Sequence, residues 1–86
     1  MRTAEVIILS EDGLHARPAS LFVREAGKFR SEITVTADGI SVNGKSIMGL
    51  LTLALCSGAV VTIAADGIDE ENAVQQLAII LAGGRS

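Results

Sequence analysis

The sequence predicts an α+β fold in which one four-stranded antiparallel sheet carries three helices on a single face, in the order β-α-β-β-α-β-α. Several short stretches alternate apolar and polar residues, which is the pattern of half-buried strands. Between them lie stretches in which apolar residues recur every three or four positions, as on the buried face of a helix. A single sheet with its helices on one face is the economical way to bury these surfaces. It is related to the split β-α-β layout of ferredoxin-like proteins.

The chain begins with a strand and a helix. Residues 3–9 alternate, although Ile7 and Leu9 leave both faces of this strand partly apolar. These two are either scattered exposed residues or a face for self-association. From Ala16 the period changes to that of a helix, for which Gly27 is a natural stop. The apolar stripe of this helix consists of Ala19, Phe22, Val23 and Ala26.

A hairpin comes next. Residues 32–37 show the cleanest alternation in the sequence, and residues 40–42 form the return strand. Asp38-Gly39 between them is a two-residue loop of the kind that favours a type I′ turn.

A short apolar helix follows the hairpin. Asn43-Gly44 closes the return strand, and Ser46 is a candidate N-cap for a helix that runs to about Leu55. Gly49 inside this helix costs ~1 kcal/mol relative to Ala, a cost that the close approach of a partner would explain.

The last strand and helix complete the pattern. Val60 to Ala65 form the strand, Asp66-Gly67 turns the chain, and Asp69 is expected to cap a final helix. The first turn of that helix carries two glutamates, the favourable sign of charge at this end, and Gly83-Gly84 ends it. Its buried stripe is expected to contain Ala73, Val74, Leu77, Ala78 and Leu81.

Composition excludes several classes of protein. Eighty-six residues suffice for one domain, residues 1–86. The net charge of −3 and the presence of only two aromatic residues argue against nucleic-acid binding. With one histidine and one cysteine we expect no metal cluster and no internal disulfide, and Cys56 is expected to be a buried small hydrophobe. No apolar run is long enough for a signal peptide or a membrane span, so a soluble, cytoplasmic protein is expected.

One segment, residues 12–20, concentrates reactive groups. His15 lies where a loop meets a helix, and Pro18 fits the first helical turn because the amides there have no partner within the helix. The free amides of Ala16 and Arg17, with the guanidinium of Arg17, would form an anion site beside a neutral imidazole. Such an arrangement suits a phosphohistidine. A bland interpretation competes with this one: a histidine that only caps the helix, and an arginine that is only a solvated surface charge.

Two motifs resemble the HPr family, the histidine-containing phosphocarriers of the bacterial sugar phosphotransferase system. They are the seven residues from Gly13 to Ala19, which resemble the family's active-site motif, and the eight from Asn43 to Leu50, which resemble its second signature. The resemblance implies an open-faced β-sandwich. It implies that the Nδ1 atom of His15 accepts a phosphoryl group from enzyme I and passes it to sugar-specific IIA components. The chain would then be a stoichiometric carrier and not an enzyme, with no cofactor.

The resemblance also implies a role for Ser46. Structurally this residue is an N-cap, which needs no further explanation. The Gram-positive form of the motif implies a site for HPr kinase/phosphorylase, whose phosphate would weaken binding to enzyme I. Asp12 departs from the uncharged residue common in the family, and it either faces His15 and opposes its phosphorylation or points into solvent.

Two surfaces are candidates for docking partners. Residues 15–30 carry a charge of +3 while the rest of the chain sums to −6, and Arg24 and Lys28 extend a basic helical face away from Arg17. Ile47, Met48 and Leu51 are expected on the outer side of the short helix, opposite Leu50, Leu53 and Ala54, unless all six are buried. Residues at the positions of these three dock enzyme I and IIA partners in HPr-like proteins.

Two alternatives to the sugar phosphocarrier remain open. The chain could be a regulatory module whose output is set by Ser46, for instance a corepressor of a catabolite-control transcription factor. It could also be a paralogue that serves a nitrogen-related phosphotransfer chain. His15 and Arg17 together favour a carrier over a purely regulatory relative, and Ile47-Met48 favours the Gram-positive sugar system. A monomer is expected in each case.

Overall fold

The computed structural model describes residues 1–8, 16–53 and 58–82, without the side chains of Ala16 and Arg17. Its elements follow the predicted order β-α-β-β-α-β-α. They are β1 (Arg2–Ile7), α1 (Ala16–Ala26), β2 (Glu32–Ala37), β3 (Ile40–Asn43), α2 (Ile47–Thr52), β4 (Val60–Asp66) and α3 (Glu70–Leu81).

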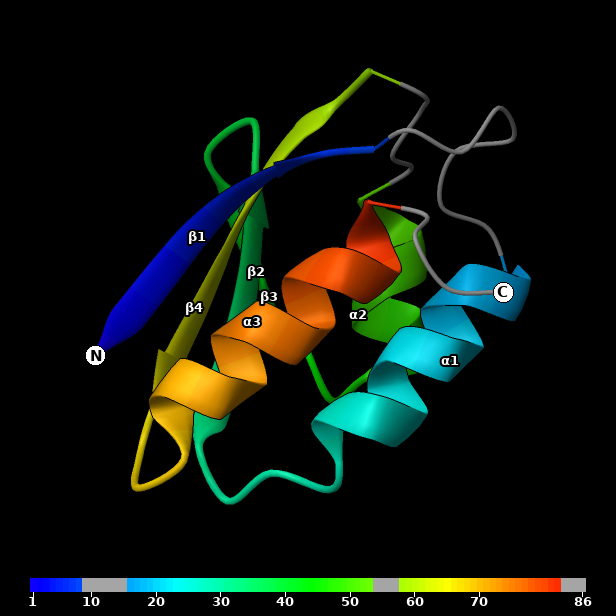
Figure 1. The fold of residues 1–86 in the computed structure, drawn as a ribbon. Helices are drawn as coiled ribbons and strands as arrows, with labels where there is room; N and C mark the ends of the chain where they lie inside the picture. Colours follow the sequence, from blue (N-terminus) through cyan, green and yellow to red (C-terminus); the bar gives the residue numbers. More distant parts are fainter. Residues whose placement is uncertain (9–15, 54–57, 83–86) are drawn as a thin grey trace.

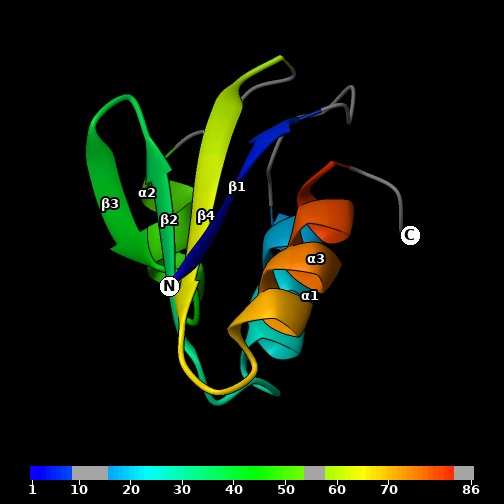
Figure 2. The same cartoon turned by 60° about the vertical axis from the view of Figure 1, so that its left-hand side comes forward.

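The four strands form one antiparallel sheet in the spatial order β1-β4-β2-β3. The strands β2 and β3 are joined by the predicted tight turn, in which both Asp38 (φ 52°) and Gly39 (φ 78°) adopt the left-handed conformation that a type I′ turn requires. The first strand of the chain lies at one edge of the sheet, and the second half of the hairpin lies at the other (Figure 2).

All three helices cover one face of this sheet (Figure 1). Helix α3 packs on β1 and β4, α2 packs on β3, and α1 contacts both other helices. The sheet contributes alternate residues to the core, such as Val61, Ile63 and Ala65 on β4, and the helices contribute stripes centred on Phe22, Leu50 and Leu77. The predicted class, an α+β open-faced sandwich, is therefore confirmed.

The ends of several elements differ from the sequence prediction. Helix α2 ends at Thr52 instead of near Leu55, and Leu53 is its C-cap. Gly27 follows α1 but is not in the left-handed region, and its amide still bonds to the carbonyl of Val23 as in a helix. The stop at Gly27 therefore does not depend on the conformational freedom of glycine. The predicted buried stripe of α3 omitted Ile80, which is also buried.

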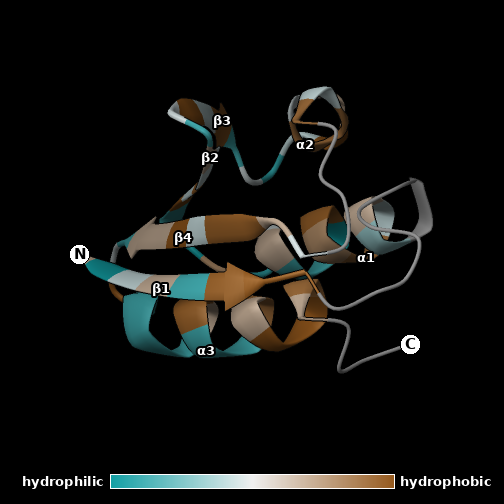
Figure 3. Ribbon diagram, turned by 90° about the horizontal axis from the view of Figure 1, so that it is seen from above, coloured by the Kyte–Doolittle hydropathy of each residue, from teal (hydrophilic) through white to brown (hydrophobic). Residues whose placement is uncertain are grey.

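The other face of the sheet is open. Ile7 and Val60 face each other across β1 and β4, and each is about half exposed (53% and 54%). Figure 3 shows the corresponding change along β1, from hydrophilic at its beginning to hydrophobic at its end. Ile7 is thus on the open face as expected, whereas Leu9 lies outside the described residues. Within the described residues, no helix is long and apolar enough to cross a membrane.

Candidate functional site

Helix α1 begins at Ala16, directly after the candidate phosphohistidine. Pro18 occupies its first turn, where a proline removes no helical hydrogen bond. The sequence prediction that a helix starts at this junction is confirmed. His15 and Asp12, like the side chain of Arg17, lie outside the described residues. The proposed phosphoryl site is therefore supported by the start of α1 and by the chemistry of its residues.

The basic residues in the last turn of α1 and just after it are exposed. Arg24 and Lys28 are both accessible to solvent. The ammonium of Lys28 lies 2.8 Å from the Oε2 atom of Glu25 and forms an ion pair with it. This pair is near the surface and contributes little to stability.

Helix α2 exposes apolar side chains. Met48 is 69% exposed and Leu51 37%, while Leu50 is fully buried beneath them. Ile47 is only half-buried on the outer side, because part of its side chain packs against the core. The expected division of this helix into an inner and an outer side therefore holds for Leu50, Met48 and Leu51. The candidate docking surface is narrower than predicted, and Ala54 lies outside the described residues.

Ser46 caps α2 as predicted. Its backbone is extended (φ −114°, ψ 117°), and its Oγ atom accepts a hydrogen bond of 3.1 Å from the amide of Gly49. A Cβ atom on Gly49 would lie 3.3 Å from Cβ of Val42 on β3 and 3.4 Å from Oγ of Ser46. The glycine therefore lets α2 lie close to β3 of its own sheet, which accounts for a small residue at this position. The close approach of a partner here stays a prediction.

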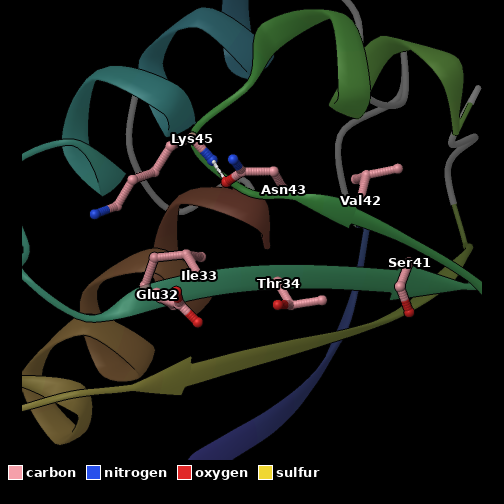
Figure 4. Close-up of a pocket in the computed structure, with 7 residues that line it drawn as sticks. All are labelled: Glu32, Ile33, Thr34, Ser41, Val42, Asn43 and Lys45. Carbon is pink, nitrogen blue, oxygen red and sulfur yellow. Dashed lines mark hydrogen bonds between the residues drawn. The ribbon is translucent and has the colours of Figure 1, made fainter.

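Residues 43–45, which precede Ser46, are held by more hydrogen bonds and closer contacts than the sequence indicated. The amide of Gly44 donates to the carbonyl of Ile33 (2.8 Å), and a Cβ atom on Gly44 would lie only 2.5 Å from Cγ2 of Ile33. The Oδ1 atom of Asn43 accepts from the amide of Lys45 (2.9 Å), as Figure 4 shows. The amide of Ser46 donates to the carbonyl of Asn43 (3.1 Å). The Asn-Gly pair was the only sequence signal of this turn.

Three of these residues, Ile33, Asn43 and Lys45, border a shallow hollow beside β2 and β3 (Figure 4). Hydroxyl, amide, ammonium and carboxylate groups line it together with two aliphatic side chains. The lining residues are Glu32, Ile33, Thr34, Ser41, Val42, Asn43 and Lys45. Within the described residues there is no cluster of three or more His, Cys, Asp or Glu side chains that could hold a metal ion.

Asp69 has a different role from the one predicted. It occupies the N-cap position of α3, but its side chain makes no capping hydrogen bond. Its carboxylate instead accepts from the hydroxyl and amide of Ser31 (2.6 and 3.0 Å) and from the amide of Arg30 (2.8 Å). The Ser31 hydroxyl, and after it the Arg30 amide, lower the pKa of Asp69 below its ordinary value of 3.8. Three donors on another loop thus outcompete the helix for this carboxylate.

This fold and its helix starting beside a histidine define a small open-faced α+β sandwich with a candidate phosphoryl-acceptor site. A family model described as "PTS HPr component phosphorylation site" matches residues 2–82. The phosphocarrier protein HPr of Haemophilus influenzae is 49% identical over 81 residues, which cover 94% of this chain and 95% of that protein. The chain belongs to the HPr family of phosphocarrier proteins.

Solved structures agree with this assignment. A phosphocarrier protein HPr from Bacillus anthracis has a TM-score of 0.89 and 42% identity, covering 93% of this chain and 95% of its own. The Crh protein of Bacillus subtilis, described as a catabolite repression protein and a swapped dimer, has a TM-score of 0.78 and 44% identity. That match covers 96% of this chain and 95% of Crh. The relatives of this chain thus include phosphocarrier proteins and a protein that is described by catabolite repression.

Proposed function

We propose that this chain is a phosphoryl carrier of the sugar phosphotransferase system, with His15 as the acceptor. Enzyme I would donate the phosphoryl group: the bond between phosphorus and the donor histidine breaks, and a bond to Nδ1 of His15 forms. In the second transfer the bond between phosphorus and Nδ1 of His15 breaks, and a bond to a histidine of a IIA component forms. The start of α1 at Ala16, beside His15, carries this proposal together with the family match.

The roles of the neighbouring residues follow from charge. The amides in the first turn of a helix have no partner within that helix. Those at the beginning of α1, that of Ala16 among them, and the guanidinium of Arg17 would bind the phosphoryl oxygens. Transfer between two imidazoles needs positioning and charge stabilisation more than covalent assistance. The chain therefore needs no cofactor or metal of its own. Each molecule accepts one phosphoryl group and gives it up again, so it acts as a stoichiometric carrier and not as an enzyme. Because its donor is charged by phosphoenolpyruvate, we place the chain in the cytoplasm.

Docking would use both exposed helical surfaces. Arg24 and Lys28 would meet acidic surfaces of enzyme I and IIA partners, and Met48 with Leu51 and the exposed part of Ile47 would fill apolar contacts. Methionine suits a surface that binds several partners.

Ser46 supports a second, regulatory function. HPr kinase/phosphorylase would phosphorylate its hydroxyl, which places negative charge next to Met48 and weakens binding to enzyme I. The similarity to Crh favours a further use of that state, as a corepressor of a catabolite-control transcription factor. A nitrogen-related phosphotransfer chain is the remaining alternative. We expect a monomer, whereas the Crh structure is a dimer, and sedimentation of the purified chain distinguishes these.

Intact-mass spectrometry tests the carrier function. The wild type and His15→Ala are incubated with phosphoenolpyruvate, magnesium and a general enzyme I. A single acid-labile phosphoryl adduct that the variant lacks supports transfer to His15. Absence of the adduct with a competent enzyme I would shift the assignment to a nitrogen-related carrier or a regulatory module. With ATP and HPr kinase, an acid-stable adduct that Ser46→Ala abolishes supports regulation at Ser46.

A further inference from the structure

Lys45 stands apart from the other basic residues whose side chains are described. Arg2, Arg24, Lys28 and Arg30 are exposed, but the side chain of Lys45 is half-buried. Its Nζ atom donates a 2.8 Å hydrogen bond to the carbonyl oxygen of Phe29. Within the described residues it forms no ion pair with a carboxylate. This ammonium therefore makes a contact within the protein and is not simply solvated.

The acceptor of that hydrogen bond lies in the turn that follows α1, three residues after the helix ends at Ala26. The amides of Gly27, Lys28 and Phe29 bond back to carbonyls of the last turn of α1, so this turn is tied to the end of the helix. The hydrogen bond from Lys45 therefore reaches α1 through a turn that is itself held to the helix.

The backbone of Lys45 is fixed next to the beginning of α2. Its amide is held by the side chain of Asn43, and the next residue, Ser46, caps α2. Gly44, on its other side, is pinned against Ile33 of the central sheet. Lys45 thus connects the turn that follows α1 to the start of α2, at a point where the backbone has little freedom to adjust.

We propose that Lys45 is a positioning residue that fixes α2 relative to α1, and with it the apolar part of the docking surface relative to the basic part. This inference rests on the proposed function, because Arg24 and Lys28 lie on or just after α1 while Met48 and Leu51 lie on α2. A partner that binds both parts at once needs them at a fixed separation. Lys45 acts through this geometry and does not touch the phosphoryl group.

Lys45→Met tests the proposal, because methionine keeps an unbranched apolar stem and removes the ammonium. Lys45→Arg restores a donor. Arg30→Met is the matched control, since it removes an exposed charge whose side chain makes no hydrogen bond or ion pair with the described residues. Two quantities are measured for each variant: KM and kcat for phosphorylation by phospho-enzyme I, and hydrogen exchange of the Lys45 and Gly49 amides. Thermal unfolding verifies that each variant is folded.

The proposal expects Lys45→Met to raise KM several-fold with kcat unchanged and to accelerate exchange at both amides. Lys45→Arg should recover most of both effects, and Arg30→Met should show neither. Faster exchange with an unchanged KM would overturn the positioning role, leaving only a structural one. A raised KM with unchanged exchange would also overturn it, because Lys45 would then contact the partner directly. If the wild type itself is not phosphorylated, the proposed function fails, and the exchange measurement still decides whether Lys45 holds the two helices together.

Discussion

At the scale of single residues, the most informative group is the carboxylate of Asp69. The sequence places it correctly at the start of α3, and a local rule assigns it to that helix. In the structure this carboxylate instead accepts hydrogen bonds from Ser31 and Arg30, which lie more than thirty residues away in sequence. Ser31 is fully buried, so its hydroxyl needs this acceptor.

Asp69 makes stability depend on pH. Because its pKa is lower in the folded chain than in the unfolded chain, its contribution is fully present above the unfolded value and is lost as the pH falls through the folded value. We expect the wild type to exceed Asp69→Asn in stability at about pH 7, with the difference shrinking below about pH 4. Denaturant unfolding across this range measures it. Asp38→Asn, in the exposed hairpin turn, is the control, and a difference that stays constant with pH would contradict the assignment.

Gly44 is required for steric reasons. We expect Gly44→Ala to destabilise the fold by about 1–3 kcal/mol, because the added methyl group would overlap the buried side chain of Ile33. Gly27→Ala is the matched control: its methyl group meets only ordinary contacts of 3.5 Å and its φ is not positive, so we expect no loss. Equal unfolding midpoints for the two variants would show that β2 can shift to make room at Gly44.

At the scale of elements, the two sides of α2 serve different purposes. Leu50 is fully buried and holds the helix on the core, whereas Met48 contacts mainly solvent. Sequence periodicity predicted this division. It misplaced the end of the helix and could not show that Ile47 is partly buried, because six residues contain fewer than two turns.

Stability and partner binding should therefore separate on α2. We expect Leu50→Ala to cost about 2–5 kcal/mol of unfolding free energy through the cavity that it leaves. We expect Met48→Ala to change stability by less than about 0.5 kcal/mol while raising KM for phosphorylation by enzyme I. Chemical denaturation and steady-state transfer assays provide the two measurements. A large loss of stability in Met48→Ala would mean that this side chain belongs to the core.

At the scale of the whole molecule, charge is distributed unevenly. A chain of net charge −3 exposes Arg24 in the last turn of α1 and Lys28 just after that helix, at the opposite end of α1 from His15. Such a basic area on an acidic protein attracts an acidic partner to this helix, while acidic surfaces elsewhere repel it.

This distribution predicts a dependence on salt. We expect KM for enzyme I to rise with ionic strength, because screening weakens the attraction between exposed charges. The double variant Arg24→Gln/Lys28→Gln should start from a higher KM and respond less to added salt. Arg30 is also exposed but lies outside the proposed surface, so Arg30→Gln should respond as the wild type does. An unchanged salt response in the double variant would remove these two residues from the docking surface.

The sequence by itself determined the order of the elements, the fold class, the Asp38-Gly39 hairpin and the helix that begins beside His15. Periodicity, turn chemistry and first-turn proline are local properties, so residues near each other in the chain suffice to read them. Only the tertiary structure decided that Asp69 binds Ser31, that Gly44 must pass Ile33, that Gly49 faces β3, and that Lys45 reaches Phe29. None of these contacts follows from local sequence patterns, because each depends on how strands, turns and helices pack against one another.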